Sequence, residues 1–316
     1  MTIPSAEGVR VAWDSVPAPV RAGIEQICGA PVVRAVSQPG GFSPGVAARL
    51  QCADGTRWFV KAVSADANPV TPVMHRREAQ ILRGLDPLIA TGRLPVPRLR
   101  GALEADPWTV LILDDVEGRH PRMPWHSDDL AEVLAAVDRL ADALTPAPID
   151  ADVVTRRFAD DFTGWRTLAA APDHGRLDPW SRAHLDQLAA LERSWPAHAA
   201  GPTLLHMDLR ADNILLTGDR VMIVDWPHAC QGAAFIDLVA LAPSITMQGG
   251  PPPAEQLATT RTGRAAGPEA LASAVCALAG YFTQRSLQPP PPGIPTVRAF
   301  QAAQGLIARE WLATLL

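Results

Sequence analysis

Lysine is almost absent from this sequence. Lys61 is the single lysine among 28 lysine and arginine residues in a chain of 316. Arginine carries a broad planar guanidinium, whereas lysine presents a compact ammonium that fits between phosphate groups and a carboxylate. We therefore interpret Lys61 as a residue at a site where arginine cannot replace lysine. The alternative is that this one lysine was retained by chance.

Long apolar runs and basic tracts are also absent. No apolar run approaches the roughly 18 residues of a membrane span, and the first residues lack the basic and apolar segments of a secretory signal. A net charge of -5 gives no general attraction for nucleic acid or anionic membranes. We expect a cytoplasmic protein, either a monomer or a homodimer, with neither a nucleic-acid nor a membrane partner.

Cysteine is scarce and scattered. The chain has no Cys-x-x-Cys pair, and its four cysteines are Cys28, Cys52, Cys230 and Cys276. A disulfide framework or a cysteine-based metal site is typical of closely spaced pairs, so both are disfavoured. We expect four buried free thiols.

The first third of the chain is typical of a β-sheet with one helix. Apolar alternation and turn signals predict strands near residues 32–36, 46–52, 57–63, 98–103 and 108–113. A helix is expected over residues 72–85. The charged segment that starts at Asp114 and ends at Gly118 interrupts this pattern. We place the boundary between two domains there, with expected ranges 1–115 and 116–316.

The second domain is expected to be mostly helical. Ser127 and the acidic residues after it are typical of a helix start. Apolar residues at three- and four-residue spacing predict helices at 127–144, 153–170, 179–195, 233–241, 253–260, 268–282 and 295–316. The fold class is therefore α+β, with a β-rich N-terminal lobe and a helical C-terminal lobe.

The segment His206-Met-Asp-Leu-Arg-Ala-Asp-Asn213 carries most of the functional information. A strand is expected to lead into it, and a short hairpin after it returns the chain to the same edge, so that Asp208, Asn213 and Asp225 converge. A carboxylate that accepts a hydroxyl proton, beside an amide oxygen and a second carboxylate that bind Mg²⁺, is what phosphoryl transfer from a nucleotide requires. We assign Asp208 as the catalytic base and Asn213 and Asp225 as the Mg²⁺ ligands.

Several residues around this motif have expected supporting roles. We expect Arg210 to reach the γ-phosphate, with an ordinary surface arginine as the alternative. His206 is expected to hold the loop by hydrogen bonds. Asp237 lies in an apolar segment, where a lone charge is costly unless it is paired, and we expect it to be buried and to hold the loop backbone. Trp226 is expected in the core, and the role of His228 is open.

A nucleotide site is expected in the first domain. Lys61 lies on a strand and Glu78 on the next helix, so the two can form the ion pair that holds the lysine on the α- and β-phosphates. A glycine loop allows backbone amides to approach phosphate, and its expected contacts are Gly40, Gly41, Phe42 and Ser43. An ordinary hairpin turn is the alternative for that loop. Leu113 and Asp114 end a strand that is expected to bind the nucleotide base through its backbone.

Taken in order, the glycine loop, the strand lysine, the helix glutamate, His-x-Asp-x4-Asn and Asp-Trp resemble the aminoglycoside phosphotransferase family, which includes macrolide, choline and homoserine kinases. The resemblance runs from about Val32 to Leu241. It implies a bilobal protein-kinase-like fold and an ATP- or GTP-dependent small-molecule kinase with Mg²⁺ as its cofactor. It also implies Asp208 as the base and Lys61 on the phosphates.

Two positions depart from the family pattern. Members commonly have His-Gly-Asp and a Gly before the Asn, where this chain has Met207 and Asp212. After Asp225 the chain carries five arginines but only four acidic residues, Asp237, Glu255, Glu269 and Glu310. This part of the chain is therefore a poor trap for polycationic aminoglycosides.

We expect the acceptor to be a small hydroxylated natural product, antibiotic-like and either uncharged or modestly charged. A metabolic kinase that acts on choline, a sugar or homoserine is the main alternative. A non-catalytic kinase-like binding module is disfavoured because the base and metal residues are all present. A protein kinase is disfavoured because no long activation segment separates Asp225 from Asp237.

Overall fold

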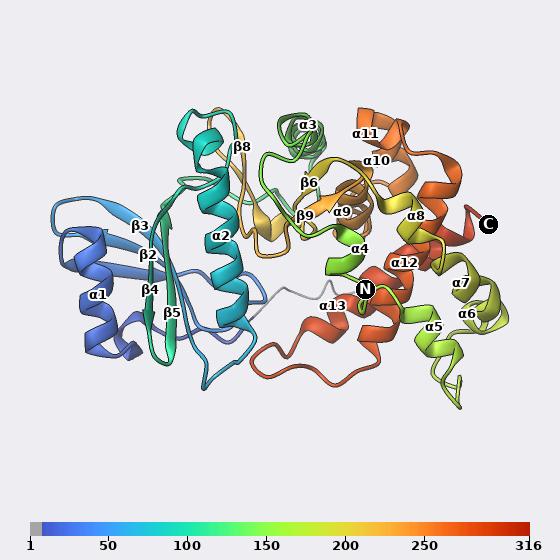
Figure 1. Cartoon of the computed structure of the whole chain (residues 1–316), viewed down its shortest axis with the longest axis horizontal. Coiled ribbons are helices and arrows are strands. Elements are labelled where there is room, and N and C mark those ends of the chain that lie inside the picture. The colour runs from blue at the N-terminus through green and yellow to red at the C-terminus, as the bar shows by residue number, and fades with distance from the viewer. Residues whose placement is uncertain (1–7) are drawn as a thin grey trace.

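The computed structural model describes residues 8–316, and residues 1–7 of the expected N-terminal domain lie outside the described residues. The architecture is α+β, as expected. A five-stranded sheet occupies one end of the molecule, helices and two small strand pairs occupy the other, and helix α2 lies between them (Figure 1).

The sheet confirms the strands expected from the sequence, within two residues at each end. Its members are β1 (Val32–Ser37), β2 (Val46–Cys52), β3 (Arg57–Ser64), β4 (Leu99–Ala105) and β5 (Trp108–Asp114). They lie in the order β1-β2-β3-β5-β4, and every neighbouring pair is antiparallel. β3 is therefore the central strand and carries Lys61.

The two faces of the sheet have different partners. Helix α1 (Ala18–Cys28), which the sequence analysis missed, follows the short 3-10 helix at Trp13–Ser15 and covers one face. Its Val20 and Ile24 share an apolar core with Val60. Successive side chains of a strand point to opposite faces, so Lys61, next to Val60, faces the other side of the sheet. Helix α2 packs on that side.

Helix α2 (Thr71–Ala90) is longer than the expected helix over 72–85. The side chain of Asn68 fixes its start, because Oδ1 accepts hydrogen bonds from the backbone N–H groups of Val70 and Thr71 at 3.0 and 2.9 Å. Glu78 lies within this helix and is buried. The helix thereby brings a carboxylate to the face of the sheet that holds Lys61.

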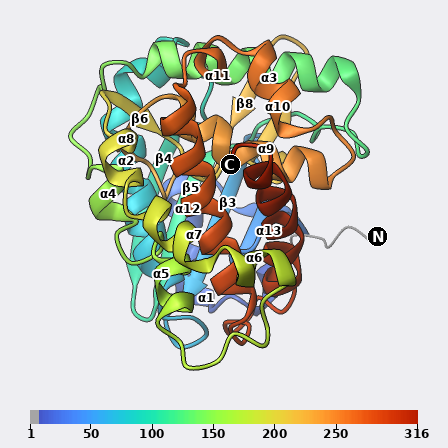
Figure 2. The same cartoon turned by 90° about the vertical axis from the view of Figure 1, so that its right-hand side faces the viewer.

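Helices of different lengths make up most of the C-terminal part. Six helices here are α3 (Ser127–Ala143), α9 (Phe235–Met247), α10 (Pro253–Thr259), α11 (Arg261–Arg264), α12 (Pro268–Ser286) and α13 (Val297–Ala313). Figure 2 shows α12 and α13 side by side, in agreement with their extensive contact. None of the helices within residues 8–316 combines the length and apolar character needed to cross a membrane.

Two expected helices are wrong as continuous elements. The segment 153–170 forms α4 (Val154–Arg157) and α5 (Gly164–Ala169), and the segment 179–195 forms α6 (Pro179–Ala183), α7 (Leu185–Glu192) and α8 (Trp195–Ala199). Buried Glu192 accepts hydrogen bonds from the backbone N–H groups of Trp165 and Arg166 at 2.9 and 3.0 Å. The first N–H groups of a helix have no partner within that helix, and these two belong to the first turn of α5. The contact with Glu192 therefore fixes the point where α5 begins, and so the gap between α4 and α5.

Short strands carry the predicted loop and hairpin. β7 (Ile214–Leu216) and β8 (Val221–Ile223) form the expected hairpin after the 3-10 helix Ala211–Asn213. β6 (Thr203–Leu205) pairs with β9 (Cys230–Gly232), which was not expected. All four cysteines are free and buried, as predicted.

Asp129 anchors the connection from the sheet to α3. Its carboxylate accepts two hydrogen bonds from Arg119, at 2.8 Å each, and further ones from the side chain of Arg122 at 3.1 and 2.8 Å. The backbone N–H of Arg122 donates to it at 2.9 Å. These two guanidinium groups hold the pKa of Asp129 far below its usual value.

Replacing this anchor should destabilise the protein in a pH-dependent way. We expect Asp129→Asn to lower the melting temperature by about 2–5 °C near pH 7. The pKa of Asp129 is depressed in the folded state, so its contribution is present above the unfolded value of about 3.9 and is lost as the pH falls below it. Melts of parent, Asp129→Asn and the exposed neighbour control Asp128→Asn should show a gap that narrows toward about pH 3. A gap that does not change with pH would contradict an ionic origin.

Candidate active site

His206 fixes the loop between β6 and β7. Its Nε2 lies 3.0 Å from the carbonyl oxygen of Val224, and its Nδ1 accepts from the backbone N–H of Asp208 at 3.1 Å. Burial lowers the pKa of His206 to about 4, so the ring is neutral, with Nε2 as its donor. The expected structural role of His206 is confirmed.

Asp237, on α9, binds the backbone of the same loop. Its two carboxylate oxygens accept from the backbone N–H groups of His206 at 2.8 Å and Met207 at 2.7 Å. Burial raises the pKa of this carboxyl to about 6. The expected buried contact between Asp237 and the loop backbone is confirmed.

Asp208 is the carboxylate that this loop presents. Asn213 Nδ2 donates to its carbonyl oxygen at 2.8 Å and to its Oδ2 at 3.1 Å, and Arg210 binds its Oδ1. Burial raises the pKa of Asp208 to about 7 against the opposing effect of Arg210, while the charges of Asp225 and Asp212 raise it further. Asp208 is therefore a more basic carboxylate than a surface aspartate.

Arg210 has two kinds of partner. It binds Asp212 through Nε at 3.0 Å and Nη2 at 2.9 Å in addition to Asp208. Its guanidinium carbon also lies 5.2 Å from the ring centroid of Phe42 and 6.0 Å from that of Phe300. The two rings contact each other edge to face at 5.1 Å. Arg210 thus joins the loop that carries Asp208 to the glycine loop and to α13.

Lys61 lies between two carboxylates from different parts of the chain. Its ammonium is 2.8 Å from both oxygens of Glu78 and 2.7 Å from Oδ1 of Asp225. Burial alone would lower the pKa of Lys61, but Asp225 and Glu78 outweigh it and hold the value above the usual range. The same contact holds the pKa of Asp225 below its usual value despite burial. Lys61 and Asp225 are therefore charged at neutral pH, whereas burial raises the pKa of Glu78 against the opposing effect of Lys61.

A cavity of about 670 Å³ lies beside this cluster, within the size range of small-ligand sites. The candidate residues that line it are Gly40, Gly41, Ser43, Lys61, Glu78, Leu113, Asp114, Asn213 and Asp225. Phe42, Asp208 and Arg210 are not among the residues that line it. The structure thus places most of the expected nucleotide and metal residues around one cavity. Asp208, the expected catalytic base, lies outside this lining and is covered by Arg210.

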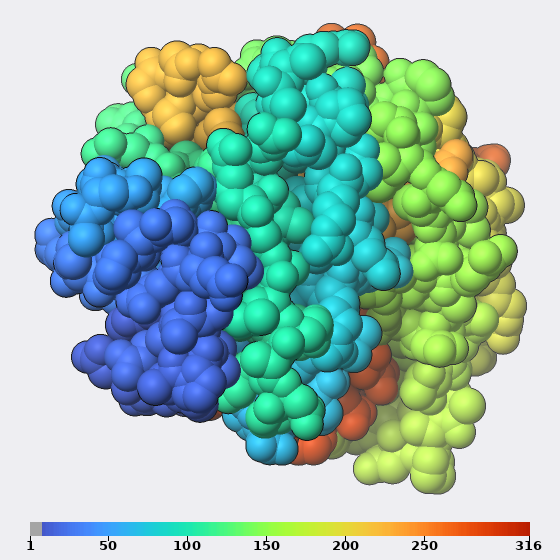
Figure 3. Space-filling model, turned by 60° about the vertical axis from the view of Figure 1, so that its left-hand side comes forward, coloured from blue at the N-terminus to red at the C-terminus, as the bar shows by residue number. Residues whose placement is uncertain are grey.

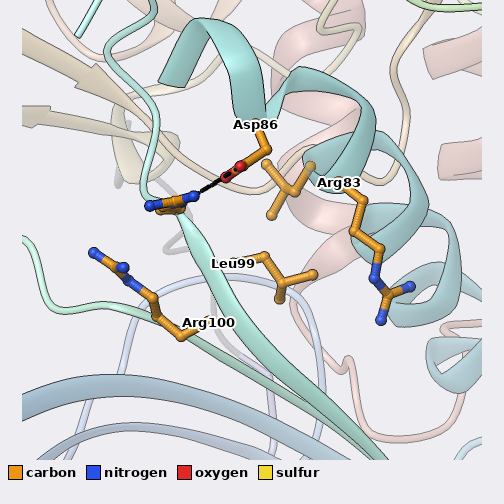
Figure 4. Close-up of a pocket in the computed structure, with 6 residues that line it drawn as sticks. Arg83, Asp86, Leu99 and Arg100 are labelled. Carbon is orange, nitrogen blue, oxygen red and sulfur yellow. Dashed lines mark hydrogen bonds and ion pairs between the residues drawn. The ribbon is translucent and has the colours of Figure 1, made fainter. Parts of the chain in front are cut away.

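A smaller hollow of about 380 Å³ lies elsewhere, between α2 and β4. Figure 4 shows Arg83 and Asp86 from the helix and Leu99 and Arg100 from the strand. Arg98 binds Asp86 across it at 2.5 and 2.8 Å. None of the candidate site residues lines this hollow, so we place no chemistry there.

Comparison with known sequences identifies relatives. The model of the phosphotransferase enzyme family matches residues 38–273. A homoserine kinase from Nitrobacter hamburgensis is 35% identical over 127 residues, which are 38% of this chain and 36% of that protein. The chain matches 34% and 36% of the lengths of two homoserine kinases, about a third of each.

Comparison with solved structures shows a shared kinase-like fold. Choline kinase LicA from Streptococcus pneumoniae has a TM-score of 0.61 at 12% identity, over 94% of this chain and 98% of that one. An aminoglycoside phosphotransferase from Alicyclobacillus acidocaldarius has a TM-score of 0.56 at 15% identity, over 90% and 91% of the two chains.

Arg10 lies before the matched residues and was missed by the sequence analysis. Its Nε donates to the carbonyl oxygen of Gln38 at 2.9 Å, and its Nη atoms bind the carbonyl oxygens of Gly40 and Ser43. The backbone around it pairs with Gly45, whose φ of 104° suits glycine and whose Cβ, if present, would lie 2.5 Å from the carbonyl oxygen of Ala62. Arg10 is 28 residues from Gln38, the nearest residue in the sequence whose carbonyl oxygen it binds. A single arginine at that separation gives no motif from which the contact could be predicted.

Removing Arg10 should loosen the glycine loop. We expect Arg10→Ala to speed amide hydrogen exchange in residues 38–45 by roughly tenfold or more, because several hydrogen bonds to the loop are lost together. Exchange in β3 should stay as in the parent. The matched control is Arg34→Ala, an exposed arginine on β1. Unchanged exchange of the loop in Arg10→Ala would show that other contacts hold it.

Proposed function

This chain belongs to the phosphotransferase enzyme family, and on that premise we propose that it moves the γ-phosphate of ATP or GTP to a hydroxyl of a small antibiotic-like natural product. The observation that carries the proposal is Lys61, held between Glu78 and Asp225 at the wall of a ligand-sized cavity. We further propose residues 1–115 as the nucleotide-binding lobe and residues 116–316 as the lobe that carries the catalytic loop and the acceptor site.

The nucleotide contacts follow from the residues that line the cavity. We assign Lys61 to the α- and β-phosphates, because its compact charge is already oriented by two carboxylates. The backbone of Gly40, Gly41 and Ser43 is assigned to the phosphates. The backbone of Leu113 and Asp114, at the end of β5, is assigned to the base. Phe42 is proposed to lie at the edge of the nucleotide site, where its ring packs against the guanidinium of Arg210.

Asn213 and Asp225 fit Mg²⁺. Asn213 gives its amide hydrogens to Asp208, which leaves its side-chain oxygen as an acceptor. Asp225 uses Oδ1 for Lys61. Mg²⁺ is usually held by one or two protein ligands, and phosphates and water complete its shell. When bound, Mg²⁺ neutralises charge on the β- and γ-phosphates.

Transfer then uses Asp208 as the positioning base. Its carboxylate accepts a hydrogen bond from the acceptor hydroxyl and takes the proton late, because a loose transition state depends on positioning more than on strong base catalysis. A bond forms between the acceptor oxygen and the γ-phosphorus, and the bond from that phosphorus to the β-γ bridging oxygen breaks. The nucleoside diphosphate leaves. We propose that Arg210 turns from Asp208 toward the γ-phosphate when nucleotide is present.

A metabolic acceptor is the second candidate. The partial similarity to homoserine kinases favours it, and choline and sugars belong to the same group of alternatives. A screen of nucleotide consumption against hydroxylated antibiotics and metabolites decides between them. Turnover of antibiotics only would support a role in resistance, and turnover of metabolites only would replace the first candidate with the second.

Asp208→Asn should separate binding from transfer. We expect the purified variant to bind nucleotide with unchanged affinity and to lose about 10²- to 10⁴-fold in kcat, because the amide cannot accept the hydroxyl proton. Steady-state kinetics and calorimetric titration with Mg²⁺-nucleotide measure the two effects. The control is Asp219→Asn, an exposed aspartate in the β7–β8 turn. Turnover near that of the parent would remove Asp208 from the mechanism.

Lys61→Arg should be nearly as damaging as Lys61→Ala. The guanidinium needs more room than the space between Glu78 and Asp225 offers, so both phosphate contact and ion pairs are disturbed. We expect a loss of at least roughly tenfold in kcat/KM, or about 1.4 kcal/mol. Arg57→Lys, the reverse exchange on the same strand, is the control. Parent-like kinetics of Lys61→Arg would show that the lysine survived by chance.

A further inference from the structure

Arg10 lines the cavity of about 670 Å³ from a segment that precedes the residues matched by the family model. Its guanidinium binds neutral oxygens, since Nε donates to the carbonyl of Gln38 at 2.9 Å and the two Nη atoms donate to the carbonyls of Ser43 and Gly40. A fourth carbonyl oxygen, that of Gly41, lies 3.4 Å from Nη2. A guanidinium has five N–H donors, so at least one donor is left without an acceptor in the described part of the chain.

Arg10 differs from the other cations at the cavity wall. The other lysine and arginine side chains that line it each lie within ion-pair distance of a carboxylate, and they are Arg49, Lys61 and Arg119. Every partner of the Arg10 guanidinium within residues 8–316 is a backbone carbonyl. Burial lowers its pKa, whereas the charges of Asp225 and Asp212 raise it. Arginine stays protonated in proteins, so a half-buried positive charge persists here, offset by carbonyl dipoles.

The glycine loop by itself offers little to bind phosphate. No side chain from Gln38 to Gly45 is charged. Pro39 and Pro44 have no N–H to donate, and the N–H groups of both end residues already donate to backbone carbonyls, at 2.8 and 3.0 Å. Phosphates carry several negative charges, and charged donors bind them more strongly than neutral amides do. Arg10, which the carbonyls of the loop hold, adds the cation that the loop lacks.

The backbone around Arg10 is held from two sides. On one side it pairs with Gly45 at the end of the glycine loop. On the other side, the N–H of Val9 donates to the carbonyl oxygen of Gly293 at 2.9 Å. Figure 3 shows the orange-red segment before α13 against the segment that leads into α2, where the side chain of Asn68 donates to a carbonyl of the former at 3.3 Å. These contacts keep Arg10 at the cavity wall before any ligand arrives.

We propose that Arg10 binds the β- and γ-phosphates of the nucleotide, as a phosphate-binding residue that the N-terminal segment adds to the glycine loop. The assignment rests on the proposed phosphotransferase function and deepens it. The two carboxylates whose charges act on Arg10, Asp225 and Asp212, lie at the end of the cavity proposed for Mg²⁺ and the outer phosphates. The guanidinium can keep its bonds to the loop and give its remaining donor to a phosphate oxygen. Nucleotide binding then supplies the anion that Arg10 lacks.

The first test varies the number of phosphates. Purified full-length protein with Mg²⁺ is titrated calorimetrically with AMP, ADP and ATP, or with the guanine series if the parent prefers GTP. We expect Arg10→Gln to weaken binding of the triphosphate about 10- to 100-fold and of the diphosphate less, and to leave the monophosphate within about twofold, because only the outer phosphates lose a charged donor. Arg34→Gln, an exposed arginine on β1, is the matched control and should bind all three as the parent does.

The second test separates the charge of Arg10 from its hold on the loop. Arg10→Lys keeps the charge but loses the planar fork that spans several carbonyls. We expect this variant to recover part of the affinity for the triphosphate, while amide exchange in residues 38–45 stays as fast as in Arg10→Gln. The affinity of Arg10→Gln for the triphosphate should also depend less on salt than that of the parent, because one contact between charges is gone. A loosened loop alone would change neither quantity.

The outcomes distinguish the phosphate contact from the function on which it rests. Equal losses for the three nucleotides, or a parent-like affinity of Arg10→Gln for the triphosphate, would overturn the contact and leave the phosphotransferase function standing. An Arg10→Lys variant that binds no better than Arg10→Gln, with an unchanged salt dependence, would assign Arg10 to loop structure alone. A parent that binds none of the nucleotides would overturn the proposed function, and the contact with it.

Discussion

The ammonium of Lys61, held between Glu78 and Asp225, is the interaction on which the rest of the site depends. It joins the central strand of the sheet, helix α2 and the segment after β8. The backbone N–H of Trp226 adds a hydrogen bond to Glu78 at 3.3 Å. Because loss of one member leaves a buried charge unpaired, these three segments are held in one arrangement that also forms the cavity wall.

Backbone conformation at the site depends on neighbouring buried groups. Met207 has φ 64° and Asp225 has φ 70°, a region that costs about 1–2 kcal/mol for most residues other than glycine. Met207 carries a Cβ, so this cost applies at its position. The hydrogen bond from its N–H to buried Asp237 offsets part of that cost. The loop therefore keeps a glycine-like shape without a glycine.

The sequence predicted the local features well and the long-range ones poorly. The loop from His206 to Asn213 and its hairpin were predictable because their spacing is local, and the structure adds the short β9 as an unexpected partner of β6. The break before α5 was not predictable, because it depends on Glu192, which is 27 residues from Trp165. Gly164 likewise approaches the backbone of Gly280, where a Cβ would lie 2.0 Å from the carbonyl oxygen. Such contacts leave no periodic signal in either segment.

Arg210 links the loop that carries Asp208 to two segments far from it in the sequence. It belongs to the loop between β6 and β7, yet it lies against Phe42 of the glycine loop and Phe300 of α13, which contact each other. An arginine that leaves Asp208 for a phosphate loses one anion and gains another, so the electrostatic change is small. The aromatic contacts must then rearrange with the guanidinium. In the proposed transfer, nucleotide binding and the release of Asp208 would be coupled through this one side chain.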